Sequence, residues 1–119
     1  MVTPDMQRIR HIQRYCQRIG DSIQRFGNDY DVFCADFDFY DAVCMRMMQI
    51  GELCAGLSEE FKQQSAGRLP WAMIKGMRNM FAHKYTAMDK EIIWNTALND
   101  IPKLLAFSED TLAREEGAP

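Results

Sequence analysis

The residues best suited to chemistry gather in one short stretch. Arg78 and Asn79 are followed by His83, Lys84 and Tyr85, in the order Arg-Asn-Met-Phe-Ala-His-Lys-Tyr. A histidine that titrates near neutral pH serves as a general acid or base. An arginine binds a phosphate and stabilises the charge that develops on it during a reaction. These residue types therefore point to chemistry on a phosphate ester.

The stretch falls at the end of a helix that we expect to start near Trp71 and to stop near Tyr85. Asn79 and His83 are four residues apart and share a face of that helix. Arg78 and His83 are five residues apart and point about 140° away from each other. One helix does not aim both at a single atom. In a two-fold dimer, Arg78 of one chain could meet His83 of the other.

RNA suits such a site because its 2′-OH supplies the nucleophile. The protein then needs a base, an acid and a cation, but neither a metal ion nor a cofactor. One histidine does not easily act as base and acid at once, so two copies of the motif favour a dimer. The same spacing is also common in helices that carry no site. Spacing alone therefore leaves a second interpretation, an oligomerisation bundle without a ligand, in which Arg78 and His83 only pair with acidic residues of a neighbouring helix.

Charge is unevenly distributed along the chain. The 119 residues are 47% apolar and 26% charged, with a net charge of −3, which is typical of one globular domain. Residues 68–90 nevertheless carry five cations against one acid, a local charge of +4. Such a zone fits an anionic ligand despite the overall sign. Lys75 and Lys84 within it are the predicted contacts to an RNA backbone.

Other classes of site lack a motif. The four cysteines form no C-x-x-C pair, and the histidines are His11 and His83 alone, which argues against structural zinc. We expect free thiols in or near the core. The acids of residues 29–41 indicate solvated surface, not a metal site.

No apolar run approaches a membrane span of about 18 residues. The N-terminus lacks a secretory signal, so a cytoplasmic protein is expected.

Helical periodicity predicts an all-α fold, an antiparallel bundle of four to five helices. Apolar residues recur every three or four positions over residues 5–26, after a start signal at Thr3 and Pro4. A second helix, capped by Asp36 or Asp38, runs to about Leu57 and should be the central one. Residues 30–38 before it are expected to form a loop or a helical turn.

The second half of the chain continues the pattern. Residues 58–61 predict a short capped turn, and the third helix follows from about residue 71. A fourth helix covers about residues 92–101. Pro102 either kinks it or opens a further helix through Phe107. The polar residues 108–119 are expected to be a frayed tail.

The string from Arg78 to Tyr85 resembles the R-x₄-H-x-Y signature of the HepT toxins, which belong to the HEPN superfamily of helical ribonucleases. Residues 41–43 and 49–52 (Gln-Ile-Gly-Glu) resemble the second helix of that family. Residues 69–71 and 74–79 resemble its entry into the third helix, and Trp94 with residues 100–104 its fourth. The resemblance covers most of residues 5–107. It implies that residues 1–119 form a single HEPN-like helical domain.

The resemblance also implies a function. Family members are toxins of two-gene, type VII-like toxin–antitoxin systems. They are homodimers with a shared cleft that cleave RNA, including tRNA, without metal. The antitoxin is a minimal nucleotidyltransferase that transfers AMP from ATP to the motif tyrosine. Carried over, Arg78 and His83 are the catalytic pair, Asn79 a polar helper and Tyr85 the AMPylated residue.

Two departures from the family pattern bear on this reading. Met80 and Phe81 stand where a charged or small residue is expected, and Lys84 adds a cation. They leave substrate preference and the details of the dimer open. The alternative is a non-catalytic HEPN module that binds nucleotide or docks a nucleotidyltransferase, with Arg78 as the phosphate clamp.

Overall fold

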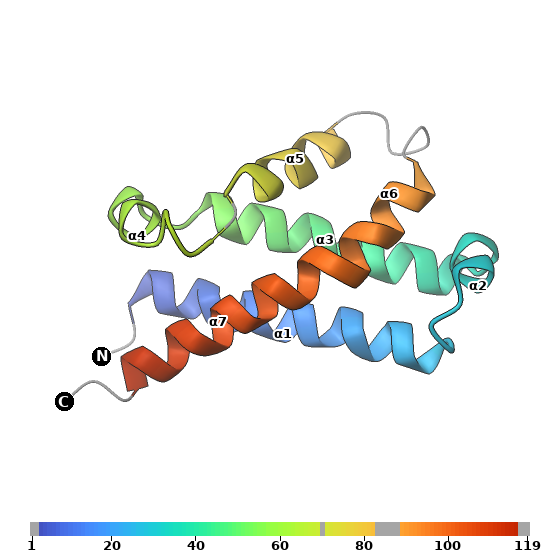
Figure 1. Ribbon diagram of the computed structural model, residues 1–119, viewed down its shortest axis with the longest axis horizontal. Helices are drawn as coiled ribbons and strands as arrows, with labels where there is room; N and C mark the ends of the chain where they lie inside the picture. The colour runs from blue at the N-terminus through green and yellow to red at the C-terminus, as the bar shows by residue number, and fades with distance from the viewer. Residues whose placement is uncertain (1–2, 70, 83–88, 117–119) are drawn as a thin grey trace.

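The helix α1 (Pro4–Arg25) forms one long edge of the computed structural model, which describes residues 3–69, 71–82 and 89–116 (Figure 1). The Thr3 hydroxyl accepts a hydrogen bond from the Met6 amide at 3.1 Å, which confirms the predicted cap. The helix is followed by Gly27 and Asn28, which take positive φ angles of 82° and 52°. Its buried face is the predicted stripe of Met6, Ile9, Ile12, Cys16, Ile19 and Ile23.

The helix α3 (Phe37–Ala55) lies at the centre of the bundle. It packs against α1 on one side and against α5 (Trp71–Ala82) on the other (Figure 1). The Asp36 carboxylate caps it by accepting from the Phe39 amide at 3.0 Å. Eight of its residues are buried, so the expectation of a central helix is confirmed. Successive long helices run in opposite directions, as predicted for an antiparallel bundle.

Residues 30–35 are helical. They form α2 (Tyr30–Ala35), which Asp29 caps through the amides of Asp31 and Val32. Phe33 is fully buried, and the centre of its ring lies 5.0 Å from the centre of the Trp94 ring on α6 (Lys90–Asn95). This aromatic contact joins α2 to α6 and closes one end of the molecule.

The other end is closed by α4 (Glu59–Gln64), the predicted capped turn. Ser58 caps it by accepting from the Phe61 amide at 3.1 Å. Asp5 of α1 accepts from the Ser58 amide at 2.9 Å and from its hydroxyl at 2.6 Å. The start of α4 is therefore tied to the start of α1.

The structure corrects the expected frayed tail over residues 108–116, and residues 117–119 lie outside the described residues. α6 passes through a π-helical segment, Thr96–Asp100, into α7 (Ile101–Glu116), so Pro102 lies in the first turn of a further helix. Leu112 is buried, and so are the polar residues Ser108 and Thr111. The Ser108 hydroxyl donates to its own helix, and Thr111 accepts from Arg68 at 3.1 Å. These polar residues are buried with partners rather than solvated.

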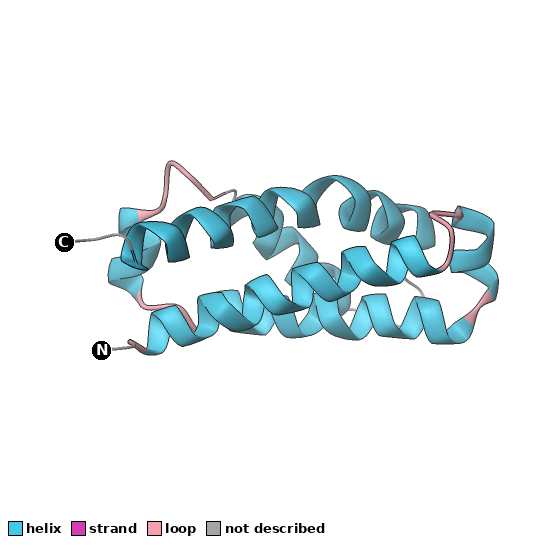
Figure 2. Ribbon diagram, turned by 90° about the horizontal axis from the view of Figure 1, so that it is seen from below, coloured by secondary structure: helices cyan, strands magenta, loops and turns pink. Residues whose placement is uncertain are grey.

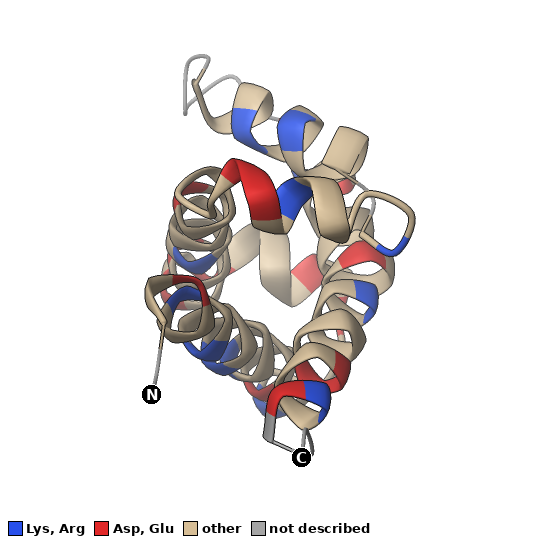
Figure 3. Cartoon of the chain, turned by 90° about the vertical axis from the view of Figure 1, so that its left-hand side faces the viewer, with Lys and Arg blue, Asp and Glu red and all other residues tan. Residues whose placement is uncertain are grey.

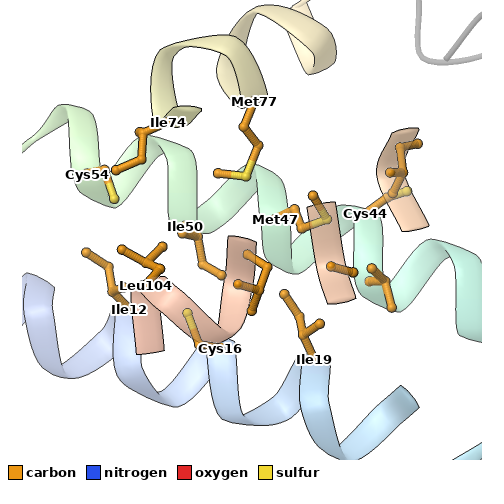
Figure 4. Packing of buried hydrophobic residues seen from close by; sticks show 14 of the residues in the cluster. Ile12, Cys16, Ile19, Cys44, Met47, Ile50, Cys54, Ile74, Met77 and Leu104 are labelled. Carbon is orange, nitrogen blue, oxygen red and sulfur yellow. The ribbon is translucent and has the colours of Figure 1, made fainter. Parts of the chain in front are cut away.

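Side chains from α1, α3, α5 and α7 meet in one core. Figure 4 shows Ile12, Cys16 and Ile19 facing α3, and Ile74 with Met77 reaching α3 from α5. Cys16, Cys44 and Cys54 are buried and Cys34 is half-buried, all as free thiols, as predicted. Every regular element of the described residues is a helix (Figure 2). None of those helices is long and apolar enough to cross a membrane.

Candidate active site

The first two residues of the predicted motif belong to α5. Arg78 and Asn79 lie on α5, in its second half. His83, Lys84 and Tyr85 lie outside the described residues. The described part of the site consists of Arg78, Asn79 and the residues around them.

A glycine on α3 makes room for Arg78. A Cβ atom added at Gly51 would lie 2.8 Å from Cγ of Arg78 and 3.7 Å from Cε of Met77. Ordinary contacts of a Cβ atom start at about 3.4 Å, so only glycine permits this approach. Gly51 thus sets how closely α5 lies on α3, and with it the position of the Arg78 side chain.

Arg78 has an ion-pair partner that spacing alone does not reveal. Its Nη2 lies 3.2 Å from Oε1 of Glu52 on α3. The two side chains are 43% and 74% exposed. Exposed pairs of this kind contribute about 0–1 kcal/mol. Glu52 therefore holds the guanidinium in place without preventing its exchange to a stronger anionic ligand.

Arg78 and Asn79 line the same pocket, of about 220 Å³. Its α3 wall is made by Met47, Met48, Gly51 and Glu52, and its α5 wall by Arg78, Asn79, Phe81 and Ala82. The two predicted polar residues are thus brought together over a largely apolar floor. Lys75 does not line this pocket but a neighbouring one, to which Arg78 also contributes.

The charge of α5 is of one sign. Its twelve residues include Lys75 and Arg78 and no acid. Figure 3 accordingly shows blue and no red on the helix at the top of the view. Within residues 3–69, 71–82 and 89–116, no cluster of His, Cys, Asp or Glu could hold a metal ion. What the arrangement offers is a cation and an amide for binding an oxyanion.

Sequence reasoning missed the role of Glu52. The residue belongs to the Gln-Ile-Gly-Glu string of the family resemblance, but nothing in its spacing pairs position 52 with position 78. The signal lay in the glycine before it. A glycine inside a predicted helix indicates a close approach by another element.

Comparison with known protein families gives a clear result. A family model described as ribonuclease HepT-like matches residues 7–111. A protein of Caldanaerobacter subterraneus subsp. tengcongensis, named "Putative RNase", is 29% identical over 108 residues, which are 91% of this chain and 94% of that one.

Two further relatives also carry names of ribonucleases. A Methanocaldococcus jannaschii protein, also named "Putative RNase", is 30% identical over 94 residues, or 77% of each chain. A "Probable ribonuclease HepT" of Thermococcus cleftensis is 29% identical over 75 residues, 63% of this chain and 67% of that one. No solved structure matches the chain significantly.

Proposed function

This chain belongs to the HepT-like ribonuclease family, and from that premise we propose that it is a metal-independent RNA endonuclease. Arg78 and His83 are the catalytic residues and Asn79 a polar helper. The observation that carries the proposal is the pocket between α3 and α5, where Arg78 and Asn79 lie side by side in the chain and share one wall. Glu52 holds Arg78 there at 3.2 Å in an exchangeable pair.

The proposed reaction is an internal transfer at phosphorus. The 2′-oxygen of RNA attacks the adjacent phosphorus, and a histidine acting as base removes its proton. The bond from phosphorus to the 5′-oxygen breaks, and an acid delivers a proton to that oxygen. The products are a 2′,3′-cyclic phosphate and a 5′-hydroxyl. Arg78 stabilises the extra negative charge on the phosphoryl oxygens.

Two histidines would come from a homodimer with a composite site. The exposed face of α3 supports this, because Phe37 (77% exposed), Met45 (62%) and Met48 (40%) are solvent-facing in one copy of the chain. Their spacing of eight and three residues puts them on one side of the helix. Met48 also lines the Arg78 pocket, so the apolar stripe leads directly to the site.

A groove beside this stripe adds room for a second copy. It measures about 710 Å³ and is lined by Arg8, His11 and Tyr15 of α1 and by Met45 and Met48 among the residues of α3. Exposed apolar patches of this kind mark interaction surfaces. A second chain seated on it would bring its own motif toward Arg78.

Regulation by an antitoxin completes the proposal. A cognate minimal nucleotidyltransferase adenylylates Tyr85 from ATP in a type VII-like toxin–antitoxin system. Tyr85 is seven residues after Arg78 in a segment of local charge +4. The added phosphate would compete with RNA for that positive charge, and the adenosine would obstruct the cleft. Transfer RNA is the proposed substrate, as the family resemblance implies.

The decisive test is cleavage of tRNA by the purified protein in EDTA. We expect products that end in a 2′,3′-cyclic phosphate, and no cleavage by Arg78→Ala or His83→Ala. Arg114→Ala is the matched control, because Arg114 is exposed on α7 and pairs with Asp110 at 3.0 Å. A catalytic variant that cuts like the wild type refutes the assignment.

A second assay tests regulation. Co-expression with the proposed cognate nucleotidyltransferase should add one or more AMP units to the wild type and none to Tyr85→Phe, which should stay toxic. AMP addition without any RNA cleavage would instead support the non-catalytic docking module. Addition of AMP to Tyr85→Phe would remove that residue from the role.

A further inference from the structure

A second pocket, of about 340 Å³, shares Arg78 with the first. It opens where α3, α4 and the first half of α5 meet. Three of its residues are cations from two helices, and none of the described residues that line it is an acid. The lining consists of Cys54, Ala55, Lys62, Trp71, Ile74, Lys75 and Arg78.

Lys62 is held at the rim of this pocket. Its Nζ donates to the carbonyl oxygen of Ala55 at 3.1 Å and lies 3.6 Å from Oε1 of Glu59. The same Nζ is 6.0 Å from the centre of the Trp71 ring. The lysine therefore keeps a defined position on a short helix that carries no other part of the candidate site.

The other two cations have weak or no competitors. Lys75 is exposed and forms no salt bridge with any residue in the described part of the chain. Among the described residues, the acid paired with Arg78 is Glu52, in the exchangeable pair. Burial raises the pKa of the Cys54 thiol to about 12, while the charges of Lys62 and Arg78 act in the opposite direction. Lys62 and Arg78 are thus both close to Cys54, which belongs to the α3 wall of the pocket.

The beginning of α5 adds further positive character. Trp71 is the first residue of this twelve-residue helix, whose first turn contains no acid. The N-terminal end of a helix favours anions through its dipole. The Trp71 side chain lines the pocket, although its Nε1–H itself is closed to solvent.

We propose that this pocket binds a phosphate of the RNA strand adjacent to the phosphate held at Arg78, with Lys62 and Lys75 as its ligands. Trp71 lines the same pocket, so its indole resonance reports on an anion bound there. Because Arg78 lines both pockets, it lies between two successive phosphates of one strand. This inference rests on the proposed function, since it assigns the strand to RNA.

The indole resonances test the proposal directly. The chain has two tryptophans, Trp71 and Trp94, and the signal lost in Trp71→Phe identifies the reporter. The first titrant is sodium phosphate against sodium chloride at equal ionic strength and pH. The second is a hexauridylate whose 2′-oxygens are methylated, which keeps the phosphates and removes the nucleophile. We expect both phosphate-bearing titrants to shift the Trp71 signal and leave that of Trp94 in place.

Charge variants provide the second measurement. Lys62→Gln and Lys75→Gln should each weaken hexauridylate binding and lower the slope of log K against log salt by about 0.7, the value for one phosphate contact on a single strand. Lys103→Gln, an exposed lysine of α7 outside the pocket, should change neither. Lys75→Gln removes no hydrogen bond or salt bridge between described residues, so it keeps the test valid if Lys62→Gln misfolds.

The outcomes separate this pocket from the proposed function. RNA that binds without moving the Trp71 signal, or unchanged slopes in both lysine variants, would overturn the pocket. A shift with phosphate but none with hexauridylate would overturn its assignment to an RNA phosphate. RNA cleavage in EDTA is measured in parallel. Cleavage without a Trp71 shift refutes the pocket alone, and a Trp71 shift without cleavage refutes the nuclease alone.

Discussion

Gly51→Ala should separate stability from activity. The new Cβ would lie 2.8 Å from Arg78 Cγ, against about 3.4 Å for an ordinary contact, so one of the two must move by about 0.6 Å (3.4 − 2.8). Overpacking of this kind costs about 1–3 kcal/mol. Replacing glycine by alanine inside a helix stabilises the folded state by about 1 kcal/mol. The free energy of unfolding should therefore fall by roughly 0–2 kcal/mol.

Activity should fall much further. The atom displaced belongs to the proposed catalytic arginine, and a misplacement of about 1 Å costs up to about 100-fold in rate. A shift of about 0.6 Å predicts a loss of roughly 10-fold or more. The loss should appear in kcat more than in RNA affinity, since the arginine keeps its charge and its exposure.

The assays are urea unfolding and single-turnover cleavage of tRNA in EDTA. Gly20→Ala on α1 is the matched control, because the Cβ it adds meets nothing within 4 Å beyond its chain neighbours and the nearby backbone of its own helix. It should raise stability by about 0.5–1 kcal/mol and leave cleavage unchanged. A Gly51→Ala protein that is both more stable and fully active would refute the close approach of α5 to α3.

Three further outcomes follow from the structure. Glu52→Gln should tighten RNA binding by freeing Arg78, and should change the unfolding free energy by less than about 1 kcal/mol because the pair is exposed; weaker RNA binding would contradict this. Met48→Glu should dissociate the proposed dimer in sedimentation experiments, whereas Ile92→Glu, at a 54% exposed residue of α6, should not. Cys54 should resist iodoacetamide at pH 8 in the folded protein, because burial raises its pKa to about 12 and leaves almost no thiolate at that pH; rapid alkylation would contradict its burial.

Local patterns in the sequence predicted much of the fold. The stripe and caps of α1 depend on residues three or four positions apart, so a single segment contains the whole signal. The same holds for Asp36 and Ser58, whose side chains bond amides three residues ahead. Helix boundaries were therefore readable wherever a cap, a glycine or a proline marks them.

Contacts between residues far apart in the sequence could not be predicted from it. Residues 108–116 are polar and resemble a tail, yet Arg68 bonds Asp110 and Thr111 across 42 and 43 positions. The pairing of Arg78 with Glu52 spans 26 positions. Such contacts depend on how helices pack, and a polar residue with a partner elsewhere looks the same in sequence as a solvated one.

The way α5 is attached bears on how the site works. Only Ile74 and Met77 of its twelve residues are buried, whereas α3 buries eight. Trp71, Met80 and Phe81 remain half-buried and line the edges of the core. A helix with so few buried anchors has little packing to hold it, so the close contact at Gly51 and the Glu52 pair matter more for the position of Arg78 than they would on a deeply packed helix. A dimer along α3, and a strand of RNA across the two pockets, would each add contacts to this element. Binding energy from parts of the substrate remote from the reacting phosphate would then fix Arg78 for catalysis.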